Sequence, residues 1–280
     1  MRTVRPGAAA LVLLSLTLLL PGSCSGGSSD SGTAGPVSHE YLPGLEAYPH
    51  LPTGVTSAPV VVLVPGGGWV SADPSGLGGL ADSLAGAGIV AVPVTIRAQE
   101  DGVVYPVPVE DVLCALADGA ATARSAGIEP TSLVLLGHSS GAHLSALAAL
   151  APQSVSPRCE DPVVEPDALV GLAGPYDIRE FGDNAEVLLG VPQQEDPVRW
   201  AAANPVLLAG RRPDVPVLLV HGDADEVVPP SATTEFGDAL RRGGHDTTVR
   251  MLPGVDHSAV YTAPVVGRDV ATWVAALPQP

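Results

Sequence analysis

Two glycines flank a serine at equal distances in the stretch GHSSG, residues 137–141. Ser139 lies shortly after the apolar run 133–136 and precedes a run rich in alanine and leucine. A tight turn from a strand into a helix strains its central residue and brings the residues two before and two after it into close contact, where a Cβ would clash. Gly137 and Gly141 therefore predict that Ser139 is a nucleophile at such a turn, and a plain helix N-cap is the alternative.

A serine hydroxyl becomes a good nucleophile only when an imidazole takes its proton and a carboxylate holds that imidazole in the right tautomer. Downstream of Ser139 the sequence has an acidic loop, HGDADEVVP at 221–229, and a histidine loop, PGVDHSAVY at 253–261. Asp225 and His257 complete the chain order serine, aspartate, histidine, which G-x-S-x-G hydrolases use. These three residues are the predicted catalytic triad.

The other acids and histidines near these motifs have structural interpretations. Asp223 and Glu226 flank Asp225 and are interpreted as loop-capping or solvated carboxylates. Asp256 is interpreted as a residue that faces water or caps the histidine loop. Of the other histidines in or beside these motifs, His138 is expected to line the serine turn, His143 to be packed or hydrogen-bonded on the following helix, and His221 to end a strand.

A run of glycines, VPGGGW at residues 64–69, follows an apolar stretch upstream of the serine. Consecutive glycines let backbone N–H groups approach a substrate closely, and a helix N-terminus favours developing negative charge. We therefore predict an oxyanion hole made of the amides of Gly67, Gly68 and Ser140. A flexible turn is the alternative for the glycine run.

Six short and almost continuously apolar runs recur along the chain, with helical stretches such as 108–127 and 230–244 between them. Strands that are apolar on both faces belong to a parallel sheet covered by helices. The sequence therefore predicts an α/β fold with a mostly parallel open sheet and helices on both faces. The predicted strands lie within residues 58–67, 88–97, 132–139, 168–177, 215–223 and 247–255.

Residues 176–212 interrupt this alternation, because they contain several short helical stretches in place of one crossover helix. Such an insertion after a strand is a candidate lid or pocket wall. Trp69, Tyr176 and Trp200 are candidate substrate-pocket residues, with packing in the core as the alternative for each.

Charge and composition exclude several classes of function. The formal net charge is −17, and without Arg2 and Arg5 the chain carries 11 Arg, no Lys and 30 Asp or Glu, which gives −19. Nucleic acid needs a basic surface, so we expect no nucleic-acid partner. The absence of lysine excludes P-loop and Schiff-base chemistry, and no metal motif occurs, so we expect neither a cofactor nor a metal.

The first 24 residues have the composition of an export signal, with two arginines before the apolar run 8–20. The segment LPGSC resembles the lipobox of bacterial lipoproteins, which implies a lipidated Cys24 and a membrane tether. Plain secretion and a retained anchor are the alternatives. Residues 25–39 then form a flexible tether rich in serine and glycine, residues 40–280 form one domain, and the chain is expected to be exported.

Three cysteines are present, and one of them, Cys24, belongs to the signal region. Cys114 and Cys159 remain as a pair in a chain expected outside the reducing cytosol. A disulfide between them is the favoured hypothesis, and a buried thiol with a separate loop cysteine is the alternative.

Taken with the motifs PGGGWVSAD, GHSSGAHLSAL, GLAGPYD, HGDADEVVP and GVDHSAVY, the chain resembles small α/β-hydrolase esterases near the hormone-sensitive-lipase, kynurenine-formamidase-like and feruloyl/acetyl-xylan-esterase-like groups. The resemblance implies the α/β-hydrolase fold, and it implies the same triad and oxyanion hole. Pro65 departs from it, because those groups often have a histidine there.

The expected reaction is hydrolysis of a small-molecule or polysaccharide-linked carboxylic ester through an acyl-enzyme. An amide or formamide hydrolase or a peptidase on the same triad, and a catalytically silent binding module, are the alternatives. The insertion is short and charged, so an interfacial lipase is disfavoured.

Overall fold

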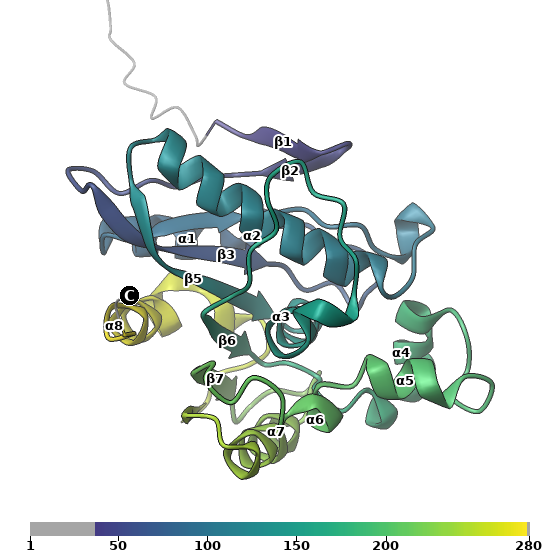
Figure 1. The fold of residues 1–280 in the computed structure, drawn as a ribbon. Helices are drawn as coiled ribbons and strands as arrows, with labels where there is room; N and C mark the ends of the chain where they lie inside the picture. Colours follow the sequence, from purple (N-terminus) through teal and green to yellow (C-terminus); the bar gives the residue numbers. More distant parts are fainter. Residues whose placement is uncertain (1–36, 279–280) are drawn as a thin grey trace, which may run out of the picture. The chain divides into compact units, whose positions relative to one another are not determined.

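A six-stranded sheet forms the centre of the part of the chain that the computed structural model describes, residues 37–278 (Figure 1). The predicted export signal, Cys24 and most of the predicted tether lie outside these described residues. The strand order is β4-β3-β5-β6-β7-β8, and each neighbouring pair is parallel. The strands are β3 (Ser57–Val64), β4 (Val90–Pro93), β5 (Glu129–His138), β6 (Ala168–Leu172), β7 (Val217–Gly222) and β8 (Thr247–Leu252).

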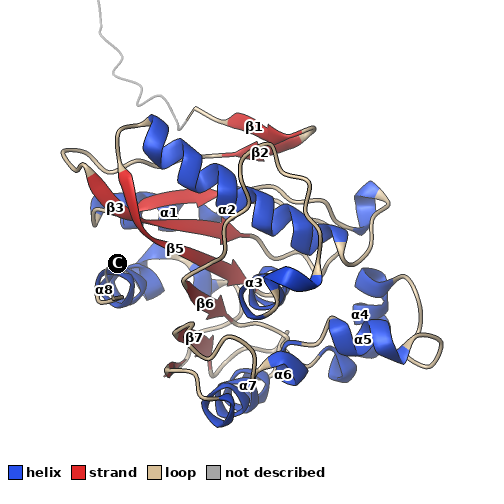
Figure 2. Cartoon of the chain, viewed as in Figure 1, coloured by secondary structure: helices blue, strands red, loops and turns tan. Residues whose placement is uncertain are grey.

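Helices cover both faces of this sheet because its strands present buried side chains in both directions. Along β3, Val60 and Val62 belong to one apolar cluster, whereas Val61 and Leu63 belong to another. Figure 2 shows the helices around the sheet. The first cluster is covered by α2 (Val107–Ser125), α3 (Ser140–Leu150) and α7 (Pro230–Gly243), and the second by α1 (Gly78–Gly86) and α8 (Arg268–Ala275).

The predicted mostly parallel sheet with helices on both faces is confirmed. Each of the six apolar runs overlaps a strand, and the helical stretches 108–127 and 230–244 coincide with α2 and α7 to within two residues. A small antiparallel pair, β1 (His39–Leu42) and β2 (Leu45–Ala47), precedes the main sheet and was not predicted. Short helical turns complete the chain: η1 (Ser75–Leu77), η2 (Gln99–Asp101), η3 (Pro152–Ser154), η5 (Ala259–Tyr261) and the π-helical η6 (Ala263–Gly267).

The insertion after β6 consists of short helices, as expected: η4 (Ile178–Phe181), α4 (Gly182–Leu189), α5 (Pro197–Ala202) and α6 (Pro205–Leu208). Side chains of Asp177, Asp196 and Asn204 cap three of them, and proline opens both α5 and α6. The N–H of Tyr105 donates to the carbonyl of Leu188 at 2.8 Å, and the Arg199 guanidinium donates to the Tyr105 carbonyl. Hydrogen bonds to the loop before α2 therefore hold the insertion in place.

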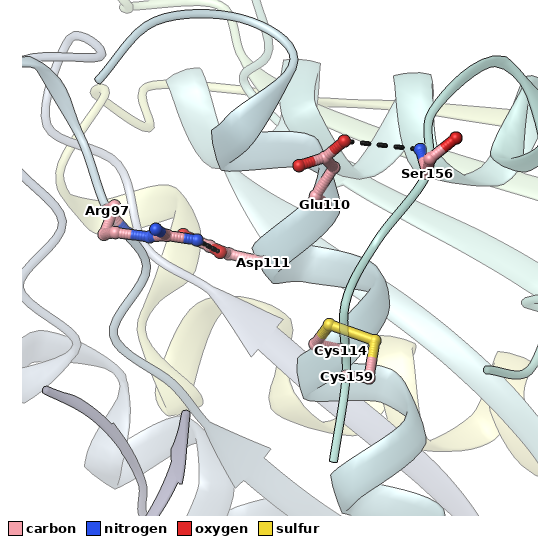
Figure 3. Close-up of a disulfide and its surroundings, with 6 residues drawn as sticks. All are labelled: Arg97, Glu110, Asp111, Cys114, Ser156 and Cys159. Carbon is pink, nitrogen blue, oxygen red and sulfur yellow. Dashed lines mark hydrogen bonds and ion pairs between the residues drawn. A yellow bond between two sulfur atoms is a disulfide. The ribbon is translucent and has the colours of Figure 1, made fainter. Parts of the chain in front are cut away.

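A disulfide joins Cys114 on α2 to Cys159 in the loop that precedes β6 (Figure 3). One turn earlier on α2, the Glu110 carboxylate accepts a hydrogen bond from the N–H of Ser156 at 3.3 Å. The loop 155–159 is therefore attached to the helix at two points. No helix within residues 37–278 is long and apolar enough to cross a membrane.

Candidate active site

The serine turn has the strained geometry that its glycines predict. Ser139 lies between β5 and α3 with φ +53° and ψ −125°, outside the regions that L-residues usually adopt. A Cβ on Gly137 would lie 2.2 Å from the carbonyl oxygen of Gly141. A Cβ on Gly141 would lie 2.3 Å from the carbonyl oxygen of Pro65. Both contacts are with backbone atoms, so only glycine fits at either position.

The structure brings Ser139, His257 and Asp225 together at the carboxyl ends of β5, β8 and β7. The Ser139 Oγ lies 3.0 Å from His257 Nε2, and His257 Nδ1 lies 2.7 Å from Asp225 Oδ2. The Ser139 side chain makes no capping hydrogen bond to α3, so its hydroxyl is free to donate to the imidazole. The arrangement can move a proton from the serine to the histidine while the carboxylate holds the imidazole tautomer.

Asp225 is surrounded by donors. Its Oδ1 accepts the N–H groups of Val227 at 2.8 Å and Val228 at 2.9 Å. Burial alone would raise the pKa of Asp225, but the hydrogen bonds from His257, Val228 and Val227 together lower that pKa below its ordinary value. The carboxylate therefore stays ionised where the imidazole has to accept a proton.

His221, at the end of β7, also contacts this carboxylate. Its Nε2 lies 3.0 Å from Asp225 Oδ2 and 3.0 Å from the Val228 carbonyl, and its Nδ1 lies 2.6 Å from Thr233 Oγ1. Burial lowers the pKa of His221, so the ring is a neutral donor at Nε2. The predicted structural role at a strand end is what the contacts show.

The glycine loop lies directly against the serine turn, since a Cβ on Gly66 would lie 3.0 Å from the Ser139 Cβ. Gly67 and Gly68 have φ +148° and +62°, and a Cβ on Gly67 would lie 2.1 Å from the Ser71 carbonyl oxygen. Within residues 37–278, no acceptor takes the N–H of Gly67 or Gly68. Ser140 is the first residue of α3, where an N–H has no partner in its own helix. Three amides are therefore available to a ligand beside the nucleophile.

A cleft of about 500 Å³ opens onto Ser139, His257 and the glycine loop. Its apolar wall includes Leu77, Val227 and Tyr261, which were not predicted. Val227 and Tyr261 follow the triad acid and base by two and four residues, and that proximity is the signal that could have found them. Leu77 comes from η1, and no motif marks it.

The prediction that Trp69, Tyr176 and Trp200 line the substrate pocket needs correction. The three residues are 5 %, 0 % and 3 % exposed, in that order, and none of them borders the cleft. The Tyr176 ring stacks on Phe236 at 4.2 Å, and Trp200 Nε1 donates to the Val191 carbonyl at 2.9 Å. Packing and internal hydrogen bonds occupy these aromatic side chains instead.

His138 lines the serine turn, as expected, and connects it to the histidine loop. Its Nε2 donates to the His257 carbonyl at 2.9 Å, and its ring packs against those of His257 and Tyr261 at 4.7 and 4.4 Å. Asp256 Oδ1 accepts the N–H groups of Ser258 and Ala259, so it caps this loop. Asp223 Oδ1 accepts the N–H of Gly254 at 2.6 Å and joins the acid loop to the histidine loop.

Two neutral histidines make the fold sensitive to acid. Burial lowers the pKa of His138 and of His143 to about 4, whereas each has its ordinary value in the unfolded chain. As the pH falls from about 6.5 towards 4, the unfolded state gains these protons and the folded state does not. For each histidine, this proton uptake lowers the free energy of unfolding by about 3 kcal/mol. Denaturant titrations at pH 7 and pH 4 should show this loss, and His143→Asn should show a smaller one. Equal stability of the parent protein at both pH values would contradict it.

Within the described residues, no group of three or more His, Cys, Asp or Glu side chains could hold a metal ion.

The chain is similar to known proteins of two kinds, curated esterases and solved structures. Esterase LipQ of Mycobacterium tuberculosis is 27 % identical over 259 residues, which cover 86 % of this chain and 59 % of LipQ. Esterase LipC of the same organism is 30 % identical over 214 residues, which cover 71 % of this chain and 53 % of LipC. The chain therefore spans little more than half the length of these curated relatives.

Solved structures share the fold at lower identity. A truncated carbohydrate esterase from gut microbiota is 21 % identical with a TM-score of 0.69, over 82 % of this chain and 89 % of that one. Thermogutta terrifontis esterase Est2 with bound propionate is 20 % identical with a TM-score of 0.69, over 86 % and 92 %. An acetyl ester-xyloside bifunctional hydrolase from Caldicellulosiruptor lactoaceticus is 21 % identical with a TM-score of 0.68, over 84 % and 90 %.

These likenesses confirm the predicted α/β-hydrolase fold. The BD-FAE family matches residues 50–240, which is more than half of the chain and includes both the glycine loop and the serine turn. The chain belongs to the BD-FAE family.

Proposed function

We propose that this protein hydrolyses carboxylic esters through an acyl-enzyme on Ser139. The observation that carries the proposal is the hydrogen-bonded series from Ser139 Oγ to His257 Nε2 and from His257 Nδ1 to Asp225, beside three amides without internal acceptors. A nucleophile, a base, an orienting carboxylate and an oxyanion hole are the parts that acyl transfer requires.

The geometry supports a two-step reaction. Ser139 Oγ bonds to the ester carbonyl carbon while its proton passes to His257 Nε2, and the N–H groups of Gly67, Gly68 and Ser140 hold the resulting oxyanion. When this tetrahedral intermediate collapses, the bond to the leaving alcohol breaks, and the alcohol takes the proton from His257. Water then gives a proton to His257 and attacks the acyl carbon, and the carboxylic acid leaves with Ser139 regenerated.

The proposed substrates are small esters and ester groups carried on polysaccharides. The cleft is open and its wall is only partly apolar, which suits a short acyl or alcohol group. The names of the relatives agree with this class, since they include esterases, a carbohydrate esterase and an acetyl ester-xyloside hydrolase.

The proposed place of action is outside the cytosol, as the export signal predicts. The Cys114–Cys159 disulfide supports this part of the proposal, because cytosolic thiols are normally kept reduced.

The test is hydrolysis of p-nitrophenyl acetate, butyrate and octanoate by the purified protein, together with labelling by a fluorophosphonate. We expect hydrolysis that is fastest for the short chains, and one label per molecule on the peptide that contains Ser139. Label on another residue would contradict the assigned nucleophile. Absence of ester hydrolysis with turnover of the matching p-nitroanilides would establish an amide hydrolase, and absence of both with no label would establish a silent scaffold.

A further inference from the structure

Trp69 has a backbone conformation that a tryptophan adopts only when its surroundings impose it. Its φ is +61°, in the left-handed region, and it directly follows Gly68, the second amide of the proposed oxyanion hole. A non-glycine residue there costs about 1–3 kcal/mol of local strain. The side chain is nearly fully buried, so its contacts can supply the restraint.

The contact that restrains the indole is with His143. Trp69 Nε1–H donates to His143 Nδ1 at 3.2 Å, and the two rings meet edge to face with centroids 5.3 Å apart. On its other side, His143 Nε2–H donates to the Ala203 carbonyl at 2.9 Å. His143 is fully buried, and these two partners permit only the neutral tautomer with its proton on Nε2.

His143 and Ser140 lie in the first turn of the same helix, α3. The amide of Ser140 is one donor of the proposed oxyanion hole, and the other two precede Trp69 in the glycine loop. Among the described residues, Trp69 makes two hydrogen bonds: its carbonyl accepts the N–H of Gln99 at 3.1 Å, and its indole N–H donates to His143. A link between His143 and Trp69 therefore ties the two halves of the hole to one rigid element.

We propose that His143 is a positioning residue that holds Gly67 and Gly68 in donor geometry by accepting the Trp69 indole N–H. The inference rests on the proposed ester hydrolysis for its kinetic consequence, but the restraint itself is a property of the folded chain. Among the described residues, the His143 side chain hydrogen-bonds to Trp69 and Ala203 and not to the triad, so its effect on the hole passes through Trp69.

Two substitutions separate the two hydrogen bonds of His143. In His143→Asn the side-chain oxygen takes the place of Nδ1, so the acceptor for Trp69 remains and the donor to Ala203 is lost. In His143→Gln the side-chain amide nitrogen takes the place of Nε2, so the donor to Ala203 remains and the acceptor for Trp69 is lost. Both variants remove the ring, so their difference reports which bond matters.

The kinetic test compares these variants on p-nitrophenyl acetate. We expect His143→Asn to keep kcat within about threefold of the parent, whereas His143→Gln should lose roughly 10- to 100-fold in kcat, below the loss from deleting an oxyanion donor outright. KM should change little in both, because the hole holds the oxyanion and not the ground-state ester. Equal kcat in the two variants would overturn the proposal.

Trp69→Phe removes the donor of the same hydrogen bond. It replaces His143→Gln in the test if that variant does not fold. It should lower kcat as much as His143→Gln does, and the double variant should lose no more than either single one. Additive losses would show that the two residues act separately. Melting temperatures of all variants are measured in parallel, and a kcat loss that follows the melting temperature in both His143 variants would mean a structural role only.

A spectroscopic readout decides the restraint without any enzymatic activity. The sequence has three tryptophans, so the Trp69 indole N–H resonance is assigned by its absence in Trp69→Phe. In His143→Gln this resonance and the amides of Gly67 and Gly68 should shift, whereas in His143→Asn they should stay near their parent positions. If the parent fails to hydrolyse esters, the proposed function fails, yet these resonances still confirm or overturn the positioning by His143.

Discussion

Replacing Ser139 by alanine should lower kcat for p-nitrophenyl acetate by about 10⁵- to 10⁶-fold. The small residual activity would come from the oxyanion hole and substrate binding alone. The reason is that, among residues 37–278, Ser139 Oγ is the hydroxyl that hydrogen-bonds to His257 Nε2, at 3.0 Å, and so it is the one that the imidazole can deprotonate. The variant should fold like the parent. The backbone strain at residue 139 should be unchanged, because alanine keeps the φ of +53°.

The matched control is Ser140→Ala, one residue further along the chain. Its proposed contribution is the backbone amide, which alanine keeps, so kcat should stay within a few-fold of the parent. The melting temperatures of both variants are measured first, and kcat is compared once these temperatures agree. Comparable rates in Ser139→Ala and the parent would show that another group carries the reaction.

The second large effect is expected for Gly141→Ala. The new Cβ would lie 2.3 Å from the Pro65 carbonyl oxygen and 2.4 Å from that of Val64, and neither backbone atom can move aside cheaply. The first turn of α3 must then separate from the end of β3, which moves the serine and the amide of Ser140 away from the glycine loop. We expect kcat to fall at least about 100-fold, because a shift near 1 Å at a catalytic centre has that effect.

Stability should fall together with activity in this variant, by about 1–3 kcal/mol for an overpacked contact. Gly86→Ala on α1 is the matched control, because a Cβ there meets nothing within 4 Å. In that helical position alanine should leave activity unchanged and add up to about 1 kcal/mol of stability. The comparison uses denaturant midpoints and kcat for both proteins, and a fully active Gly141→Ala would contradict the predicted clash.

Much of this fold could be predicted because its signals are local in the sequence. Buried parallel strands give continuous apolar runs, so all six strands of the main sheet were found in the expected segments. The serine turn was recognisable because its steric demand falls on two glycines at fixed spacing. The two-stranded pair β1 and β2 was not found, since strands of four and three residues carry too little pattern.

The pocket could not be predicted in the same way, because which side chain borders a cleft depends on packing between distant segments. Trp69 follows the glycine loop directly, yet its side chain turns inward to His143 and not towards the substrate. Tyr261 lies on the cleft because η5 carries it against His138 and Gly76. His143 was expected to be a packed or hydrogen-bonded helix histidine, but its two partners could not be named, because they lie 74 positions before it and 60 after it in the sequence.

The covalent link between α2 and the loop 155–159 bears on how this protein should be produced. In the reducing cytosol of an expression host the bond would not form, and Cys114, which is nearly fully buried, would remain as a thiol beside Cys159. Closing a loop of 45 residues is worth about 4 kcal/mol in the chain-entropy account, a large part of the stability of an ordinary domain. Material made in an oxidising compartment is therefore the appropriate starting point for every comparison of variants, since a mixed preparation would contain two proteins of unequal stability.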